Sequence, residues 1–240
     1  MLFKQFFAGE LEVVCSMPEF WRKTSIVYSG GDDFAVTGSW DALISLAREM
    51  ERLFHRFAEK NLAEFPGPEG KTLSAGLAVA SCSEASPREV FAEAGRNLET
   101  AKAAGPGCFH LLGRTLDWKN LQEAADLKDQ MASLVRDYGC SQLFLMELAS
   151  FYREGSRAPE WRGRSRSRGS RFEKPWRLHR RISRVLEAPR DREFQRLRQN
   201  LIGELIGKGV SQWRLRPAGR VALEWARLLT QFEPAPRRLG

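Results

Sequence analysis

The stretch Ser25-Ile26-Val27-Tyr28-Ser29-Gly30-Gly31-Asp32-Asp33-Phe34-Ala35-Val36 decides the fold of the first part of the chain. Residues that favour β-structure flank a pair of glycines, which is typical of a hairpin with a tight turn. The tip of this hairpin carries two adjacent carboxylates, Asp32 and Asp33. Two adjacent carboxylates repel each other unless a divalent cation lies between them. Carboxylate oxygens are ligands that favour Mg²⁺ or Mn²⁺. The pattern indicates a metal site, and an ordinary turn rich in Gly and Asp is the alternative.

Composition limits the classes of protein to be considered. The chain has 240 residues, of which 42% are hydrophobic, and this is enough for two domains with real cores. No long apolar run or cleavable signal pattern occurs, so we expect a cytoplasmic protein. The four cysteines lie far apart, which favours free thiols over a zinc site. Three widely separated histidines argue against a histidine-based hydrolase.

Charge is distributed unevenly along the chain. Residues 1–116 hold 12 Lys and Arg against 15 Asp and Glu, whereas residues 117–240 hold 26 against 15. The net charges are therefore −3 and +11. A basic second half of this kind is expected to face a polyanion.

Hydrophobic periodicity predicts an α+β fold for residues 1–116, with helices covering one face of a sheet. The expected order is a helix over Met1–Cys15, the hairpin, a helix from about Asp41, a strand over Thr72–Ala80, a helix from Pro87 and a strand over Cys108–Leu112. Ser39 or Asp41 can cap the second helix, and Ser86 with Glu89 forms a capping-box pattern. The small residues of the third strand indicate burial on both faces.

Residues 117–240 show only helical periodicity, which predicts an all-α bundle of five helices. A basic, serine-rich segment interrupts this bundle at about residues 155–174. Arginines that neutralise phosphates and aromatic residues that stack on bases alternate there and just beyond it. The candidate RNA-binding residues are Arg162, Arg164, Arg166, Arg168, Arg171, Arg177, Arg180 and Arg181. The low complexity of Ser165–Ser170 also fits a disordered insertion, and the two interpretations are compatible.

At this point the residues indicate a family. The run from Val27 to Asp41, including Gly38-Ser39-Trp40-Asp41, resembles the second palm domain of the large subunit of type III CRISPR effector complexes, the polymerase/cyclase subunit of the Csm type. Further matches follow in the family's order: Leu73–Ala78, Ala101-Lys102 and Leu116-Asp117-Trp118. The resemblance implies a ferredoxin-like palm over residues 1–116 and the family's C-terminal helical domain over residues 117–240.

The resemblance implies a nucleotidyltransferase of antiviral defence that converts ATP into cyclic oligoadenylates when the assembled complex binds target RNA. Asp32 and Asp33 would then be the catalytic, metal-binding acids, with Mg²⁺ or Mn²⁺ as the cation. Ser29, Gly30 and Gly31 would contact the nucleotide. Lys102 would reach a phosphate, although a solvated lysine at a helix end explains it equally well. Ser74 would lie beside the hairpin and is more simply a packing residue.

One departure from the family pattern concerns the sheet. In the family a strand with its own metal-facing aspartates precedes the first helix, and this strand is absent from the chain. We therefore expect the chain to be the C-terminal half of a split large subunit, or a product of internal initiation within a longer gene. A partner that carries the first palm and the missing strand would complete it, within a complex with guide and target RNA. This expectation predicts insolubility or no cyclase activity for the chain alone. A catalytically inert, small-subunit-like building block of the same complex is the alternative, and a standalone diguanylate-type cyclase fits less well.

Overall fold

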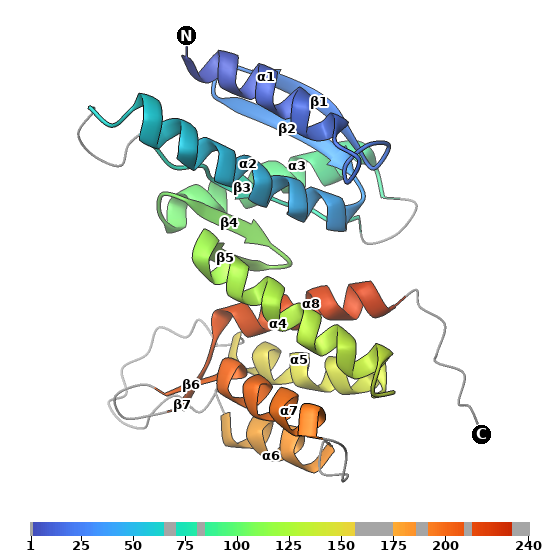
Figure 1. Cartoon of the computed structure of the whole chain (residues 1–240). Helices are drawn as coiled ribbons and strands as arrows, with labels where there is room; N and C mark the ends of the chain where they lie inside the picture. The colour runs from blue at the N-terminus through green and yellow to red at the C-terminus, as the bar shows by residue number, and fades with distance from the viewer. Residues whose placement is uncertain are drawn as a thin grey trace, which may run out of the picture. The chain divides into compact units, whose positions relative to one another are not determined.

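Two compact units make up the chain, residues 1–118 and 119–240. The computed structural model describes residues 2–64, 71–80, 85–156, 175–185, 192–208 and 213–231. No helix within these ranges is long and apolar enough to cross a bilayer. Helices predominate in both units, and strands occur in both (Figure 1).

The first unit follows the order of elements expected from its periodicity and adds one strand. Its elements are α1 (Leu2–Ser16), β1 (Thr24–Gly30), β2 (Asp33–Gly38), α2 (Trp40–Asn61), β3 (Ala75–Gly76), α3 (Pro87–Ala104), β4 (Cys108–Leu111) and β5 (Arg114–Asp117). The strand expected over Thr72–Ala80 was too long, because only Ala75 and Gly76 pair with a neighbouring strand. The additional strand β5 pairs antiparallel with β4 through a turn in which Leu112 and Gly113 both have positive φ. Such a turn is type I′.

The strands of the first unit do not form one sheet, contrary to the expectation. β1 and β2 form an antiparallel hairpin, whereas β3, β4 and β5 form a second sheet in that order. Within the described residues, no strand hydrogen bonds join β2 to β3. Among the described strands of this unit, β2 and β3 each have one edge without a strand partner, as β1 and β5 do.

Helices α1 and α2 cover the hairpin and bury its apolar side (Figure 1). An aromatic cluster fills this layer. The ring of Phe7 lies 5.5 Å from that of Phe34 on β2 and 5.6 Å from that of Phe54 on α2, measured between centroids. Phe6 and Met50 are also buried there. The face of β2 that carries Phe34 is thus fixed toward the helices.

The short strand β3 lies directly against the backbone of α3. A Cβ added to Gly76 would stand 2.2 Å from Leu98 N, so only glycine allows this approach. Asn97 donates a hydrogen bond of 2.8 Å from Nδ2 to the Leu77 carbonyl and strengthens the contact. Trp118 closes the unit, because its indole donates to the Leu73 carbonyl at 2.8 Å and its ring stacks on Phe109.

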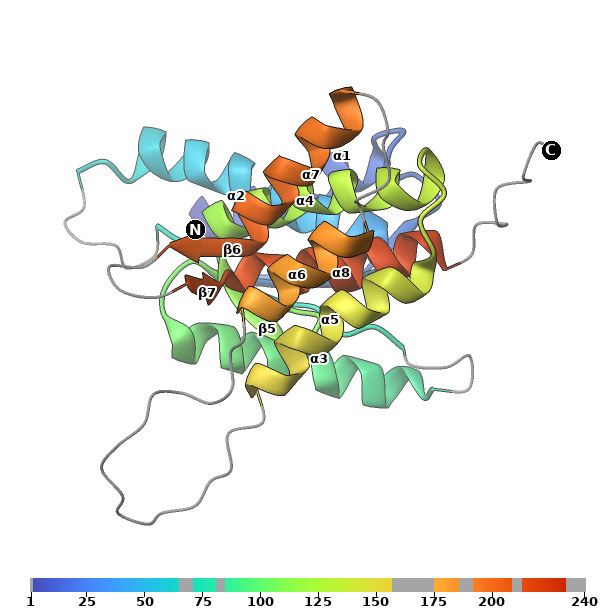
Figure 2. The same ribbon diagram turned by 90° about the horizontal axis from the view of Figure 1, so that it is seen from below.

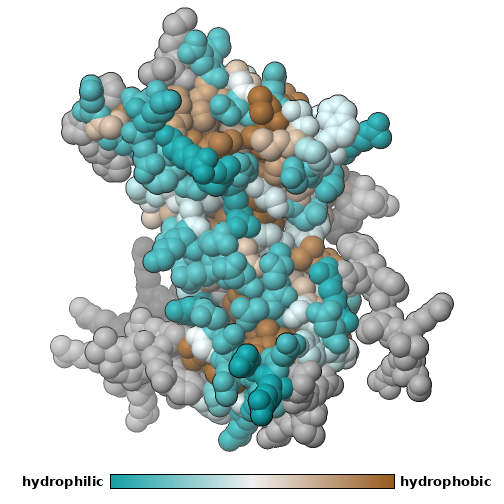
Figure 3. Space-filling model, viewed as in Figure 1, coloured by the Kyte–Doolittle hydropathy of each residue, from teal (hydrophilic) through white to brown (hydrophobic). Residues whose placement is uncertain are grey.

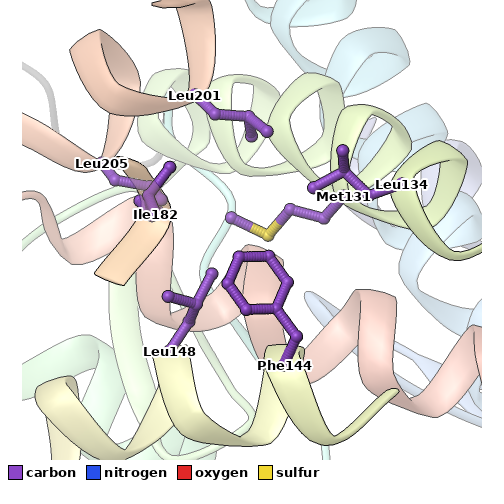
Figure 4. A pocket seen from close by; sticks show the side chains of 7 residues that line it. All are labelled: Met131, Leu134, Phe144, Leu148, Ile182, Leu201 and Leu205. Carbon is purple, nitrogen blue, oxygen red and sulfur yellow. The ribbon is translucent and has the colours of Figure 1, made fainter. Parts of the chain in front are cut away.

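The second unit contains the five expected helices, but it is not all-α. Its elements are α4 (Trp118–Arg136), α5 (Gln142–Ser156), α6 (Pro175–Val185), α7 (Arg192–Leu205), β6 (Ile206–Lys208), β7 (Trp213–Leu215) and α8 (Pro217–Thr230). The antiparallel pair β6–β7 overturns the all-helical expectation. Figures 1 and 2 both show α6 beside α7. Four helices meet in an apolar core, which Figure 4 shows as the side chains of Met131, Leu134, Phe144, Leu148, Ile182, Leu201 and Leu205.

The helix starts agree with the sequence signals in position but not in detail. Pro87 and Pro175 open α3 and α6, as expected for proline in the first turn. Ser39 and Ser86 occupy the N-cap positions of α2 and α3, yet neither side chain makes a capping hydrogen bond. The capping box expected for Ser86 and Glu89 is therefore replaced by a backbone bond of 2.9 Å from Glu89 N to Ser86 O.

Candidate functional site

The turn between β1 and β2 carries the two candidate metal ligands. Gly30 pairs with Asp33 across the hairpin, so Gly31 and Asp32 are the two central residues of the turn. Gly31 has φ +68° and Asp32 does not have a positive φ, which fits a type II′ turn. This turn requires glycine at its first central position. Both carboxylates are exposed, so the turn presents Asp32 and Asp33 side by side to solvent.

The strand register separates Asp33 from the core. Phe34 and Val36 pack toward the helices, so the alternation of β2 places Asp33 and Ala35 on the opposite face. Gly30 stands opposite Asp33 and carries no side chain, which leaves room beside this carboxylate. We call the surface formed by Asp33, Ala35 and the residues paired with them the open face.

Ser29 lies on the other side of the hairpin from the open face. It pairs with Phe34, and directly opposed residues of an antiparallel pair share a face. Its Oγ is buried and has no hydrogen-bond partner among the described residues. A nucleotide at the tip would therefore contact the backbone of Ser29. The Ser29 side chain would have to change rotamer for its hydroxyl to contact the nucleotide.

Ser74 and Lys102 come from other parts of the first unit. Ser74 is half-buried and immediately precedes β3, next to the buried Leu73. Lys102 lies in the last turn of α3, half-exposed, with its Nζ 3.7 Å from Glu99 Oε1. The packing of β3 on α3 holds these two segments together, whereas Asp32 and Asp33 belong to the separate hairpin. The nucleotide roles of Ser74 and Lys102 stay predictions.

The carboxylate pair fits a hard divalent cation in its chemistry but does not complete a coordination shell. Mg²⁺ takes near-octahedral oxygen ligands and commonly binds one or two carboxylates together with substrate phosphates and water. No group of three His, Cys, Asp or Glu side chains that could hold a metal occurs among the residues that the structure describes. Asp32 and Asp33 could thus hold a cation only together with phosphate oxygens, water or a further acidic residue.

The basic candidates are divided between described and undescribed residues. Arg162, Arg164, Arg166, Arg168 and Arg171 lie outside the described residues. Arg177, Arg180 and Arg181 lie on α6. The guanidinium of Arg177 sits 5.4 Å above the centroid of the Trp176 ring, which is 54% exposed. Arg181 donates a hydrogen bond of 2.7 Å from Nε to Glu147 Oε2 on α5.

One residue of the open face, Tyr28, is not predicted by the sequence patterns. Tyr28 is 46% exposed, and its position depends on a β-bulge that strict alternation along the strand does not predict. An aromatic residue two positions before a glycine pair was the only available signal. Figure 3 shows apolar areas among the hydrophilic surface of the first unit. Independently of this view, the exposed large apolar side chains of the unit are Val13, Trp21, Val27, Tyr28 and Phe91.

Most of the first unit is similar to a known protein family. Residues 2–106 match the family model of the Cas10/Cmr2 second palm domain. The resemblance to the type III CRISPR large subunit is thereby confirmed for this part of the chain. The match contains the Gly30–Asp33 turn, β3 and nearly all of the first unit.

Two curated relatives give the same result. The chain is 35% identical to the single-strand-specific deoxyribonuclease Cas10/Csm1 of the subtype III-A CRISPR system of Mycobacterium tuberculosis. This match spans 86 residues, which are 36% of the chain. Over 98 residues, or 40% of this chain, it is 34% identical to the corresponding Cas10/Csm1 of Thermococcus onnurineus. The matched parts cover 9% and 11% of these relatives. No solved structure matches the chain.

Proposed function

We propose that the chain supplies the nucleotide-cyclising palm of a type III CRISPR complex and makes cyclic oligoadenylate from ATP when the complex binds target RNA. The observation that carries the proposal is the exposed Asp32-Asp33 pair at the tip of a hairpin that matches the Cas10/Cmr2 second palm. The tip combines a carboxylate pair with a glycine-lined backbone. Both features favour the binding of a cation and a triphosphate.

In the proposed reaction a ribose 3′-hydroxyl attacks the α-phosphorus of ATP, a phosphodiester bond forms, and pyrophosphate leaves. Asp32 and Asp33 would hold Mg²⁺ or Mn²⁺ together with phosphate oxygens, and the cation would supply positive charge to the phosphates and favour loss of the proton of the attacking hydroxyl. Gly30 and Gly31 let phosphate oxygens approach the backbone, since no Cβ obstructs them. Lys102 contributes positive charge for a phosphate, and Ser29 and Ser74 offer weaker polar contacts.

We further propose that a strand from a partner chain completes the palm. The edges of β2 and β3 have no strand partner among the described residues, although both strands belong to one compact unit. An unpaired strand edge is a template for an additional strand. Such a strand would join the two sheets and could bring a further acidic residue to the carboxylate pair. The C-terminal half of a split large subunit fits this arrangement.

The second unit is proposed to bind the RNA of the complex through α6 and the basic segment before it. Arg177 and Arg180 are exposed on this helix, and Trp176 offers a ring for an unpaired base. Arginine contacts of this kind read the phosphate backbone, so the affinity should depend on salt and not on base sequence.

An inert structural role is the second candidate. The observation that favours it is that only two acidic side chains gather at the tip, with no group of three among the described residues. An inert palm would keep the complex assembled without making any product from ATP.

A substitution at the tip distinguishes the two functions. The complex containing the chain is incubated with ATP, Mg²⁺ and target RNA, and ATP-derived products are identified by mass. We expect Asp32→Asn combined with Asp33→Asn to abolish the cyclic products. Glu12→Gln is the matched control, because Glu12 is an exposed acid on α1, away from the turn. Equal product from the double variant and the wild type would refute the catalytic proposal and favour the inert one.

A further inference from the structure

The β-bulge in the hairpin changes the face on which Tyr28 lies. Ile26 pairs with Val36 and Tyr28 pairs with Ala35, so Val27 is an extra residue without a cross-strand partner. Strict alternation would place Tyr28 with Ile26 on the side of the helices. Because of the bulge, Tyr28 instead stands opposite Ala35, on the open face that carries Asp33. Bulges are known to re-aim side chains next to functional sites.

The ring of Tyr28 leans toward the carboxylate turn. Its Cε2 lies 3.5 Å from the point that a Cβ on Gly30 would occupy. The Tyr28 hydroxyl also donates a long hydrogen bond of 3.5 Å to the Gly30 carbonyl. Since Gly30 directly faces Asp33, the ring stands on the same side of the hairpin as this carboxylate and close to it in the register.

We propose that Tyr28 contacts the nucleoside half of the bound nucleoside triphosphate. This inference rests on the proposed function, in which the phosphates bind the cation at Asp32 and Asp33. A ring that is 46% exposed and adjacent to that pair is placed to pack against the base or ribose while the phosphates occupy the turn. Tyr28 thereby orients the substrate without touching the reacting atoms.

A purely structural role for Tyr28 makes a different prediction. An aromatic side chain that covers a neighbouring glycine can stabilise a strand. Loss of such cover would loosen the turn and weaken every ligand of Asp32 and Asp33 alike. Loss of a nucleoside contact would weaken only ligands that contain a nucleoside.

The test compares two ligands on the complex that contains the chain. Binding of a non-hydrolysable ATP analogue and of inorganic tripolyphosphate is measured by titration calorimetry with Mg²⁺ present. Tyr28→Ala is expected to weaken binding of the ATP analogue about tenfold, the usual scale of one lost base–aromatic contact, and to leave tripolyphosphate binding unchanged. Tyr28→Phe keeps the ring and should bind the analogue within about twofold of the wild type.

The neighbouring Val27 provides the matched control. It is 55% exposed and lies in the bulge, so Val27→Ala removes similar exposed apolar surface without touching the ring. We expect it to change neither affinity. Equal weakening of both ligands by Tyr28→Ala, or no weakening of the ATP analogue, would overturn the inference. If Asp32→Asn with Asp33→Asn leaves both affinities unchanged, or if the wild type binds neither ligand, the proposed function itself fails.

Discussion

Replacing Gly76 with alanine is expected to destabilise the first unit strongly. The new Cβ would stand 2.2 Å from Leu98 N, 2.6 Å from Ala94 O and 2.7 Å from Asn97 C, all backbone atoms of α3. A Cβ essentially never comes within 3.0 Å of another atom, so β3 would have to retreat by roughly 0.8 Å. That movement would also stretch the 2.8 Å hydrogen bond from Asn97 Nδ2 to the Leu77 carbonyl.

The size of the effect follows from these two losses. Overpacking costs about 1–3 kcal/mol, and a lost side-chain hydrogen bond costs about 1 kcal/mol. We therefore expect a loss of about 3 kcal/mol, which for a unit of this size lowers its melting temperature by roughly 10 °C. Thermal unfolding of the purified chain measures this shift, and hydrogen exchange of the α3 amides assigns it to the first unit.

A glycine of α3 itself provides the control. Gly95 is exposed, and a Cβ added there would meet nothing within 4 Å. Gly95→Ala should therefore leave stability unchanged or raise it by up to about 1 kcal/mol through helix propensity. If Gly76→Ala unfolds at the same temperature as Gly95→Ala, the close packing of β3 on α3 is wrong.

Four further changes test other parts of the molecule. Gly31→Val should lower the free energy of unfolding by about 1–2 kcal/mol, because the backbone of Gly31 has φ +68°. Gly30→Ala should change the free energy of unfolding by less than about 0.5 kcal/mol, and urea denaturation compares the two variants. Asp32→Asn with Asp33→Asn should leave stability within about 0.5 kcal/mol in the same assay, because both side chains are exposed, and a large loss would assign them a structural role. Arg177→Gln with Arg180→Gln should reduce the slope of log affinity for single-stranded RNA against log salt concentration by about 1.4. Arg96→Gln on α3 is the control and should leave this slope unchanged. An unchanged slope in the double variant would exclude α6 from RNA binding. Burial lowers the pKa of His110, so this side chain binds a proton more readily in the unfolded chain than in the folded one. The free energy of unfolding should therefore fall as the pH drops below 6.5. His110→Gln should weaken this pH dependence, which unfolding experiments at several pH values measure.

The hairpin and its turn could be predicted because their signals are local. Gly31 can adopt the positive φ of the turn, and the flanking apolar residues set the strands, so the position of Asp32 and Asp33 at the tip followed from the sequence. The starts of α3 and α6 were equally visible from Pro87 and Pro175.

Other features could not be predicted because they depend on tertiary contacts. The bulge at Val27 moves Tyr28 across the strand, and no residue type marks it. The turn into β5 places Leu112 at φ 49°, a conformation that leucine rarely adopts, so the sequence carried no strong signal for this hairpin. The strands β6 and β7 have three residues each, too few for a period-2 pattern to be recognised.

The expected strand over Thr72–Ala80 shows how pairing limits a strand. Its small apolar residues favour burial, and Leu73 and Leu77 are indeed buried. Only Ala75 and Gly76 find a strand partner, on β4. The edge of β3 on the other side is where the proposed additional strand would pair, so the short length of β3 fits an incomplete sheet.

The most direct test of the central claim is the mass of the products that the complex forms from ATP. With target RNA and Mg²⁺ present, we predict that the wild-type chain gives cyclic oligoadenylates and pyrophosphate, and that Asp32→Asn with Asp33→Asn gives neither while the complex stays assembled. The claim would be contradicted if the wild type released no cyclic product, or if the double variant released as much as the wild type.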